Sequence, residues 1–160
     1  MSESTGILYN DEMDDFTARP GEPNAFGLVQ SEANAPQPGN RPLSSMSPTI
    51  VLRDGKAVAL AGASGGPRII SATSQVLWHM LHGDDPGTAV RRPRIHHQWM
   101  PNIVRCEAEI DLTFFDMTTS IGHQTEAVEG RLGICQAIKV TESGVHAACD
   151  PGKGGRPAGG

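Results

Sequence analysis

The sequence predicts an α+β fold with hairpins that belong in an antiparallel sheet. Three observations support this prediction. Two pairs of β-rich runs are each joined by a short turn that contains glycine. A long segment between these pairs repeats its apolar residues with the period of an α-helix. Hairpins pair their strands antiparallel, and strands and helices that are segregated along the chain are typical of the α+β class.

The composition allows one domain with a modest core. The chain has 160 residues, of which 38% are hydrophobic and 4% aromatic, and its 19 Gly and 12 Pro predict a large share of loop. We therefore expect apolar surface that a partner chain covers. The formal net charge of −5 disfavours binding to nucleic acid or to an anionic membrane, because either ligand requires clustered Lys and Arg.

Neither the cysteines nor the N-terminus indicates a disulfide-built secreted protein. Three cysteines leave at least one unpaired, although a Cys135–Cys149 bridge across a terminal hairpin stays open as an alternative. Met1 to Ser4 has neither the basic nor the apolar region of a signal peptide. No run reaches the roughly 18 apolar residues that a membrane segment needs. The compartment is therefore unassigned.

The N-terminal region combines an acidic cluster with a long loop. Residues 1–5 have no expected structural role, and Gly6–Asn10 fits a short strand. Asp11–Phe16 sets four carboxylates around two apolar side chains, which fits a solvated turn, a helix N-terminus or a pocket for a cation. An amine suits this pocket better than a metal, because the spacing of calcium-binding loops is absent. Residues 17–41 are typical of a lid, a binding loop or a linker.

A hairpin followed by a helix is predicted in the middle of the chain. Thr49–Arg53 and Ala57–Ala61 are apolar strands around the turn Asp54–Lys56, where Gly55 tolerates the positive φ of a tight turn. The helix spans about Pro67–His82, because proline suits a first helical turn and the apolar residues that follow share one face. That face comprises Ile69, Thr73, Val76, Leu77 and Met80.

Glycines and hydroxyls flank this hairpin. The pair Gly65-Gly66 either turns the strand into the helix or offers N–H groups to an oxyanion. Ser44 and Ser45 suit a substrate carboxylate, since nothing marks a general base beside them. The residues around Ser64 match the letters of G-x-S-x-G, but a nucleophile elbow of this kind belongs in a mostly parallel sheet, so a Ser64 nucleophile is disfavoured. The same glycines do not match a phosphate-binding loop.

The C-terminal half is expected to add one strand, two helical pieces and a second hairpin. His96 and His97 would point to opposite faces of a strand, so a structural role is favoured over a shared metal. The expected elements are a turn at Asp84–Gly87, a short helix at Thr88–Arg92, a strand at Ile103–Leu112, a helix at Thr119–Leu132, the hairpin strands Gln136–Val140 and Val145–Cys149, and a flexible tail at 151–160.

An acidic cluster for an amine, serines for a carboxylate and glycines for an oxyanion would together suit an α-amino acid that bears an acyl group. Four motifs in this order resemble the small subunit of γ-glutamyltranspeptidases, and the resemblance covers about residues 6–150. The motifs are Asn10–Phe16, Arg41–Thr49, Gly62–Gly66 and Pro93–Trp99. The resemblance implies part of an N-terminal-nucleophile hydrolase fold, an αββα sandwich of antiparallel sheets flanked by helices.

The resemblance also implies a site for the γ-glutamyl group of compounds such as glutathione, without a cofactor or metal. Residues 17–41 fall where family members carry a lid loop. In the family, a threonine freed by autocleavage attacks the γ-glutamyl carbonyl, and its own α-amino group acts as base. Carried over by position, Glu12 and Asp15 would hold the α-amino group, Ser44 and Ser45 the α-carboxylate, and Gly65 and Gly66 the oxyanion.

Two departures from the family pattern shape the expected function. Ser64 stands where the pattern usually has proline. A Thr-Thr-His-like nucleophile start upstream of the acidic motif is missing, because Thr5 is too close to Glu12 and Thr118-Thr119 lies downstream and lacks the following His. The large subunit, with half of the fold and an arginine for the carboxylate, is also missing. We therefore expect residues 1–160 alone to be inactive and to require a large subunit or another complementing chain.

Three further interpretations stay open. The chain could be a catalytically inactive module that still binds γ-glutamyl compounds. It could be a degenerate gene fragment that does not fold stably, since its apolar core is small. It could also belong to a related branch of the family that hydrolyses the side chains of cephalosporins. Family members are often periplasmic, secreted or at the cell surface.

Overall fold

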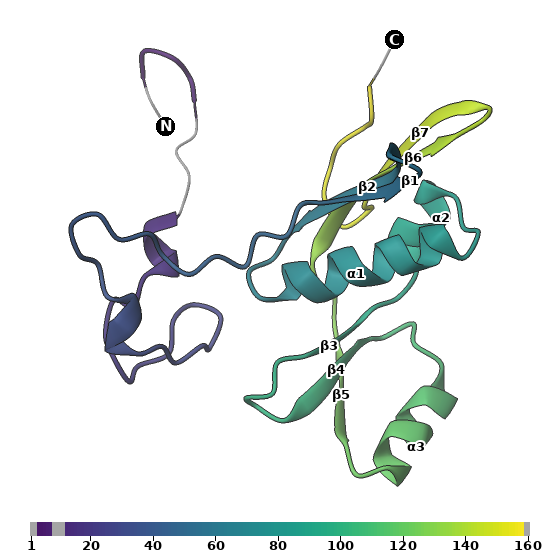
Figure 1. Cartoon of the computed structure of the whole chain (residues 1–160). Helices are drawn as coiled ribbons and strands as arrows, with labels where there is room; N and C mark the ends of the chain where they lie inside the picture. The colour runs from purple at the N-terminus through teal and green to yellow at the C-terminus, as the bar shows by residue number, and fades with distance from the viewer. Residues whose placement is uncertain (1–2, 8–11, 159–160) are drawn as a thin grey trace. The chain divides into compact units, whose positions relative to one another are not determined.

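The computed structural model describes residues 3–7 and 12–158, which divide into two compact units, 1–44 and 45–160 (Figure 1). Each unit is described by itself. Most of the predicted strand Gly6–Asn10 and the first acidic residue, Asp11, lie outside the described residues. No helix within the described ranges is both long and apolar enough to cross a membrane.

The first unit consists of loops around two short 3-10 helices, η1 (Glu12–Asp15) and η2 (Glu32–Asn34). A single β-bridge joins Pro23 to Val29 across the tip of the loop. The backbone N–H of Thr17 donates to the Asn34 carbonyl at 3.0 Å, so the segment after η1 is tied to the end of η2.

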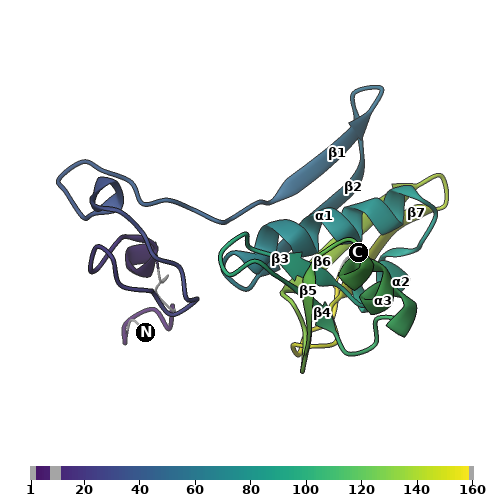
Figure 2. The same cartoon turned by 90° about the horizontal axis from the view of Figure 1, so that it is seen from below.

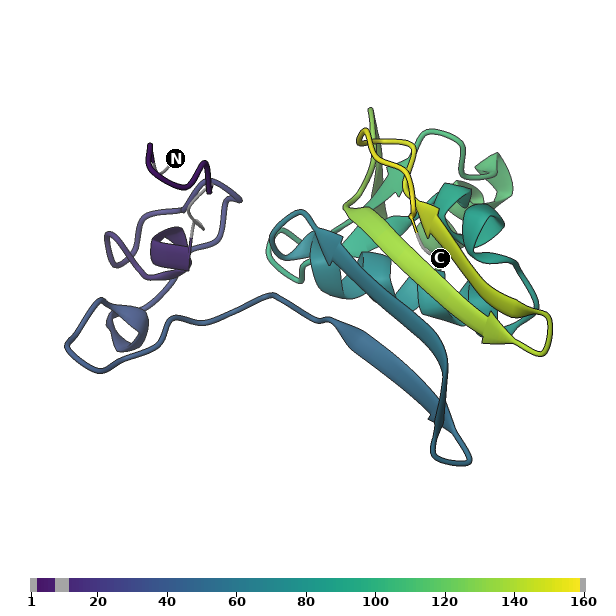
Figure 3. The same ribbon diagram turned by 90° about the horizontal axis from the view of Figure 1, so that it is seen from above.

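The second unit contains an antiparallel sheet that confirms both predicted hairpins (Figure 3). Its strand order is β1-β2-β6-β7, so the two hairpins lie side by side through the β2–β6 pair. Asp54 and Gly55 have φ of 52° and 75°, as a two-residue hairpin turn requires. The strands are β1 (Thr49–Arg53), β2 (Lys56–Ser64), β6 (Ile134–Thr141) and β7 (Gly144–Cys149).

Two helices cover one face of this sheet, α1 (Arg68–Leu81) and α2 (Pro86–Arg91). The predicted apolar face of α1 is buried as expected. The sheet contributes mainly small side chains to the core, whereas the helices contribute the larger ones, so the helices can approach the strands closely. The buried core comprises Ala59, Ala61, Val76, Leu77, Met80, Ala89, Val90, Cys135 and Ala137.

A second, three-stranded sheet has the order β3-β4-β5, with α3 (Leu112–Ser120) packed against β5 (Figure 2). Its strands are β3 (Ile95–His97), β4 (Ile103–Glu107) and β5 (Gln124–Val128). The β4–β5 pair is the one parallel pair among the strands of the described chain. Helix α1 packs on β2 and β6 and also contacts β3, so it lies between the two sheets (Figure 1).

Three of the expected elements were wrong in their bounds or in their kind. The strand predicted for Ile103–Leu112 ends at Glu107, where the Ile110 N–H donates to the Glu107 carbonyl at 3.0 Å and closes a turn. The Asp111 carboxylate then accepts the Thr113 N–H at 2.8 Å and begins α3. The helix predicted for Thr119–Leu132 is instead the end of α3 followed by β5, because Gly122, at φ 94°, ends the helix. Pro86 and Gly87 belong to α2 and not to a turn, since Asp85 caps that helix.

The bridge considered for Cys135 and Cys149 is absent, and the three cysteines are free. The register explains this result. Cys149 pairs with Gln136 and therefore shares a face of the sheet with Gln136. Cys135 precedes Gln136 along β6 and points to the opposite face. The two thiols thus lie on different sides of the sheet.

Candidate functional site

The acidic residues with a predicted role in amine binding lie on η1. Glu12 is exposed, and Asp15 is half-buried at the end of the helix. The Asn34 side chain links Asp15 to the next motif, because its Nδ2 donates to the Asp15 carbonyl at 2.7 Å and its Oδ1 accepts the Leu43 N–H at 2.9 Å. The first unit therefore brings the main chain at Asp15 close to the residue before Ser44, across 28 positions of sequence that include the whole predicted lid.

The two serines belong to different units. Ser44 is the last residue of the first unit and is exposed, and Ser45 is the first residue of the second unit and is half-buried. Both lie in the irregular chain that leads into β1.

Gly65 and Gly66 lie between β2 and α1, where the glycine pair was predicted. Both have positive φ, 134° and 57°, a conformation that side chains with a Cβ rarely adopt. The Gly65 carbonyl accepts the Arg68 N–H at 3.3 Å, and so it points into the helix. In a trans peptide the N–H points opposite to the carbonyl, so the Gly66 N–H points away from the helix body. This geometry offers a backbone donor at the positive end of a 14-residue helix.

A cluster of four charged residues, three of them buried, lies inside the second unit. Arg94 and Asp150 form an ion pair with 2.6 Å between Nη2 and Oδ2. Arg131 donates from Nη1 to Glu107 Oε2 at 2.6 Å, and Arg94 Nε lies 3.3 Å from Glu107 Oε1. The four residues come from separate segments, so no local spacing in the sequence could reveal the cluster.

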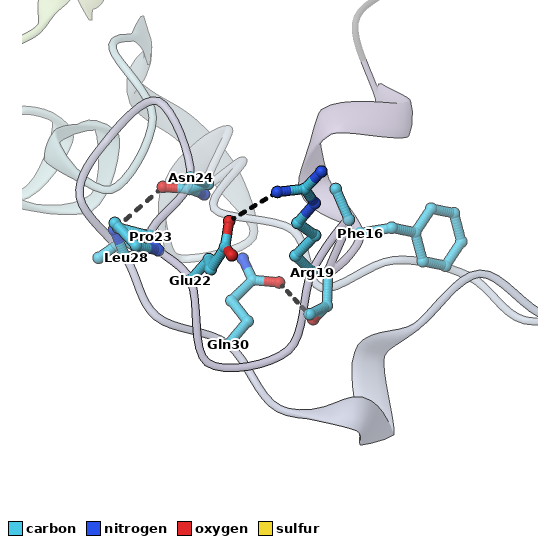
Figure 4. A pocket seen from close by; sticks show the side chains of 9 residues that line it. Phe16, Arg19, Glu22, Pro23, Asn24, Leu28 and Gln30 are labelled. Atoms are coloured by element: carbon cyan, nitrogen blue, oxygen red, sulfur yellow. Dashed lines mark hydrogen bonds and ion pairs between the residues drawn. The ribbon is translucent and has the colours of Figure 1, made fainter.

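The predicted lid contains a cavity of about 230 Å³ (Figure 4). Arg19 and Glu22 form an exposed ion pair at 3.3 Å on its wall, and Thr17 Oγ1 lies 3.1 Å from Gln30 Oε1. The Asn24 side chain accepts the N–H groups of Phe26 and Leu28 and so orders the tip of the loop. The polar groups that line the cavity pair mainly with one another, which indicates a structured loop.

The face of the four-stranded sheet that the helices leave open is apolar. The register places Ile50, Leu60, Ile138 and Ala147 in one row across all four strands on this face. Ile50 is 61% exposed, and the row lines a shallow groove. An apolar sheet face of this kind is typical of a surface that packs against another layer.

His96 is buried and His97 is exposed, as strand alternation predicts. Burial lowers the pKa of His96, and the nearby Arg68 and Arg105 add to this effect, while a hydrogen bond with Gln98 opposes it. The His96 Nδ1 lies 2.8 Å from Ser71 Oγ. No group of side chains among the described residues is arranged to hold a metal ion.

Comparison with known proteins assigns the family. The family model described as gamma-glutamyltranspeptidase matches residues 1–160. The chain belongs to the γ-glutamyltranspeptidase family. It is 42% identical to the glutathione hydrolase proenzyme of Escherichia coli over 149 residues, which is 92% of this chain and 26% of that protein. It is 55% identical to the corresponding proenzyme of Pseudomonas sp. over 109 residues, which is 68% of this chain and 19% of that protein.

Solved structures of γ-glutamyltranspeptidases match the fold. A mutant enzyme of Helicobacter pylori has a TM-score of 0.83 at 38% identity, covering 94% of this chain and 84% of that one. The Pseudomonas nitroreducens enzyme complexed with L-DON has a TM-score of 0.78 at 40% identity, covering 99% of this chain and 83% of that one. The fold is thus that of the N-terminal-nucleophile hydrolases, as expected. The chain spans about a fifth to a quarter of the curated relatives' length.

Proposed function

We propose that this chain supplies the γ-glutamyl-binding part and the oxyanion hole of a γ-glutamyltransferase or glutathione hydrolase. The observation that carries the proposal is the Gly65–Gly66 loop, whose Gly66 N–H points away from the N-terminus of α1. A backbone donor in such a position can stabilise the negative charge that develops on a carbonyl oxygen during acyl transfer. Membership of the family supports γ-glutamyl compounds as the substrate class.

In the proposed reaction, a threonine outside residues 1–160 attacks the γ-glutamyl carbonyl carbon through its Oγ, and its α-amino group takes the Oγ proton. The negative charge moves to the carbonyl oxygen, where the N–H groups of Gly65 and Gly66 stabilise it. Collapse of this intermediate breaks the C–N bond, and the amine leaves with the proton. Water or an amino-group acceptor then attacks the acyl-enzyme and releases glutamate or a new γ-glutamyl compound.

The remaining predicted site residues position the substrate. Glu12 and Asp15 would bind its α-amino group, and Ser44 and Ser45 its α-carboxylate. The link through Asn34, from the Asp15 carbonyl to the Leu43 N–H, supports this division of roles, since it couples the acidic motif to the serine motif. Two ends of one amino acid would thereby be held by two segments that a single side chain connects.

The partner in this proposal is the large subunit, or a complementing chain of the same kind. The apolar row Ile50, Leu60, Ile138 and Ala147 supports it, because a second sheet could bury this row face to face. Such packing would complete the αββα sandwich and supply the nucleophile and an arginine for the carboxylate.

Calorimetry with L-glutamate tests the binding part of the proposal. We expect the chain, alone or mixed with a large-subunit polypeptide, to bind L-glutamate. Asp15→Ala should weaken binding by roughly 10²-fold, since it removes one of the two carboxylates proposed to bind the ammonium group. Asp14→Ala is the matched control, because Asp14 is an exposed carboxylate on the same short helix. Equal affinities for the two variants would contradict the assignment of Asp15.

A further inference from the structure

Gly133 packs directly against the loop that carries Gly65 and Gly66. Ser64 pairs with Ile134 at the end of the β2–β6 ladder, so Gly65 and Gly133 face each other just beyond it. A Cβ added to Gly65 would lie 3.1 Å from the Gly133 Cα. A side chain on Gly65 would therefore push the loop away from Gly133.

Gly133 also lies against α1. A Cβ added to it would lie 2.9 Å from the Ala72 Cβ and 3.4 Å from the Arg68 carbonyl oxygen. The φ of Gly133 is 88°, a conformation that favours glycine. Gly133 thus fills the space between the end of β2 and the first two turns of α1, the same two elements that Gly65 and Gly66 connect.

Glu107 fixes the chain immediately before Gly133. The Leu132 N–H donates to Glu107 Oε1 at 2.6 Å, and Arg131 Nη1 donates to Glu107 Oε2 at 2.6 Å. The Glu107 side chain is fully buried, and Arg131 Nη2 also donates to the Val90 carbonyl at 2.6 Å. One buried carboxylate therefore holds two successive residues, and Gly133 has little freedom to move.

We propose that Gly133, held in place by Glu107 through Leu132, is a positioning residue for the Gly65–Gly66 loop. The inference rests on the proposed function, because it assigns Gly133 a role in aiming the oxyanion donor. Gly133 itself touches no reacting atom. Displacing it would move Gly65, and the peptide that carries the Gly66 N–H would turn with it. Such a donor is effective only when it points at the position of the oxyanion.

The test compares Gly133→Ala with Gly130→Ala in the chain assembled with a large-subunit polypeptide. Gly130 is the matched control, because it lies in the same connection at φ 79° and an added Cβ would meet nothing within 4 Å. Both variants therefore introduce backbone strain, but only Gly133→Ala introduces the contact. We expect Gly133→Ala to lower kcat for a γ-glutamyl anilide by about 10²-fold with little change in KM. The double variant Gly133→Ala/Ala72→Gly should recover part of the loss.

Hydrogen exchange over residues 62–69 gives a readout that does not depend on turnover. We expect faster exchange of the Gly65 and Gly66 amides in Gly133→Ala but not in Gly130→Ala. If Gly133→Ala fails to fold, Glu107→Gln replaces it, with the same expected result. Equal effects of the two alanine variants on kcat, or on exchange, would overturn the inference. If the wild-type assembly shows no turnover, the proposed function fails, and the exchange comparison alone then decides the role of Gly133.

Discussion

Arg94 and Asp150 lie 56 positions apart in the sequence and form a fully buried ion pair. Arg94 immediately precedes β3, and Asp150 immediately follows β7, so the pair joins the three-stranded sheet to the end of the four-stranded sheet. Asp150 Oδ2 also accepts the Cys135 N–H at 3.3 Å, and its Oδ1 accepts the Gly152 N–H at 2.9 Å. The carboxylate thus organises the main chain as well as the arginine.

Replacing Asp150 should destabilise the chain strongly. Asp150→Ala leaves the Arg94 guanidinium buried without its closest partner, and removing one member of a buried pair costs about 3–5 kcal/mol. Denaturant titration monitored by circular dichroism measures the free energy of unfolding. Glu126→Ala is the control, because its pair with Arg105 is half-exposed and such pairs contribute about 0–1 kcal/mol. If both variants lost a similar amount of unfolding free energy, the strong contribution assigned to the Arg94–Asp150 pair would be contradicted.

Asn34 is predicted to matter for substrate binding more than for chemistry. Asn34→Ala removes the link between the Asp15 carbonyl and the Leu43 N–H, so the groups proposed to bind the two ends of the substrate lose their relative placement. We expect KM for a γ-glutamyl anilide to rise by roughly tenfold in the assembled enzyme, the effect of a misplaced binding group. Asn24→Ala, which loosens only the tip of the loop, is the control. A KM that rises in Asn24→Ala but not in Asn34→Ala would contradict the role assigned to Asn34.

His96 should make the fold less stable in mild acid. Burial lowers its pKa in the folded chain below the ordinary 6.5, so between these two pKa values the unfolded chain binds more protons than the folded chain. The stability that the neutral His96 ring contributes is therefore fully present above about pH 6.5, and it is lost as the pH drops through the folded pKa. NMR titration of the His96 ring gives the midpoint directly. A midpoint at or above pH 6.5 would show that the pKa of His96 is not lowered and would contradict this prediction.

The cysteines should differ in reactivity. Burial raises the pKa of Cys135 to about 11, so almost none of it is thiolate near neutral pH. Cys149 is half-buried on the open face of the sheet. We expect iodoacetamide at about pH 8 to label Cys149 well before Cys135 in the folded chain, as mass spectrometry of the peptides can determine. Labelling of both at the same rate, or a Cys135–Cys149 disulfide after mild oxidation, would conflict with the register.

Local patterns predicted the elements whose cause is local. The apolar residues of α1 recur with helical spacing within 14 residues, and Asp54-Gly55 is a turn signal within a single hairpin. The predictions of this helix and this hairpin therefore agree with the structure. The helix expected at Thr119–Leu132 failed because β5 exists through its parallel pairing with β4, a contact that the sequence does not display. Gly122 was the local signal that could have corrected it.

The candidate site was predictable only in part. Residue chemistry indicated an amine site, a carboxylate site and an oxyanion site, and the resemblance to a family named the residues for each. The supports of that site are not visible in the sequence. Glu107 and Gly133 stand 26 positions apart, and Asn34 acts through backbone atoms of Asp15 and Leu43. Such contacts depend on tertiary packing and leave no spacing that a pattern could match.

Release of the aniline from a γ-glutamyl anilide is the direct test of whether this chain supplies part of the acyl-transfer site. We expect no turnover by residues 1–160 alone, because these residues contain no Thr-Thr-His nucleophile start. We expect turnover once a chain that supplies the N-terminal threonine is assembled with it. A backbone ester at Gly66, made by semisynthesis with glycolic acid in place of glycine, removes the proposed N–H donor and still allows the positive φ of 57°. It should lower kcat in that assembly by about 10²–10³-fold. Clear turnover by the pure chain, or full activity of the assembly that carries the Gly66 ester, would contradict the proposed reaction.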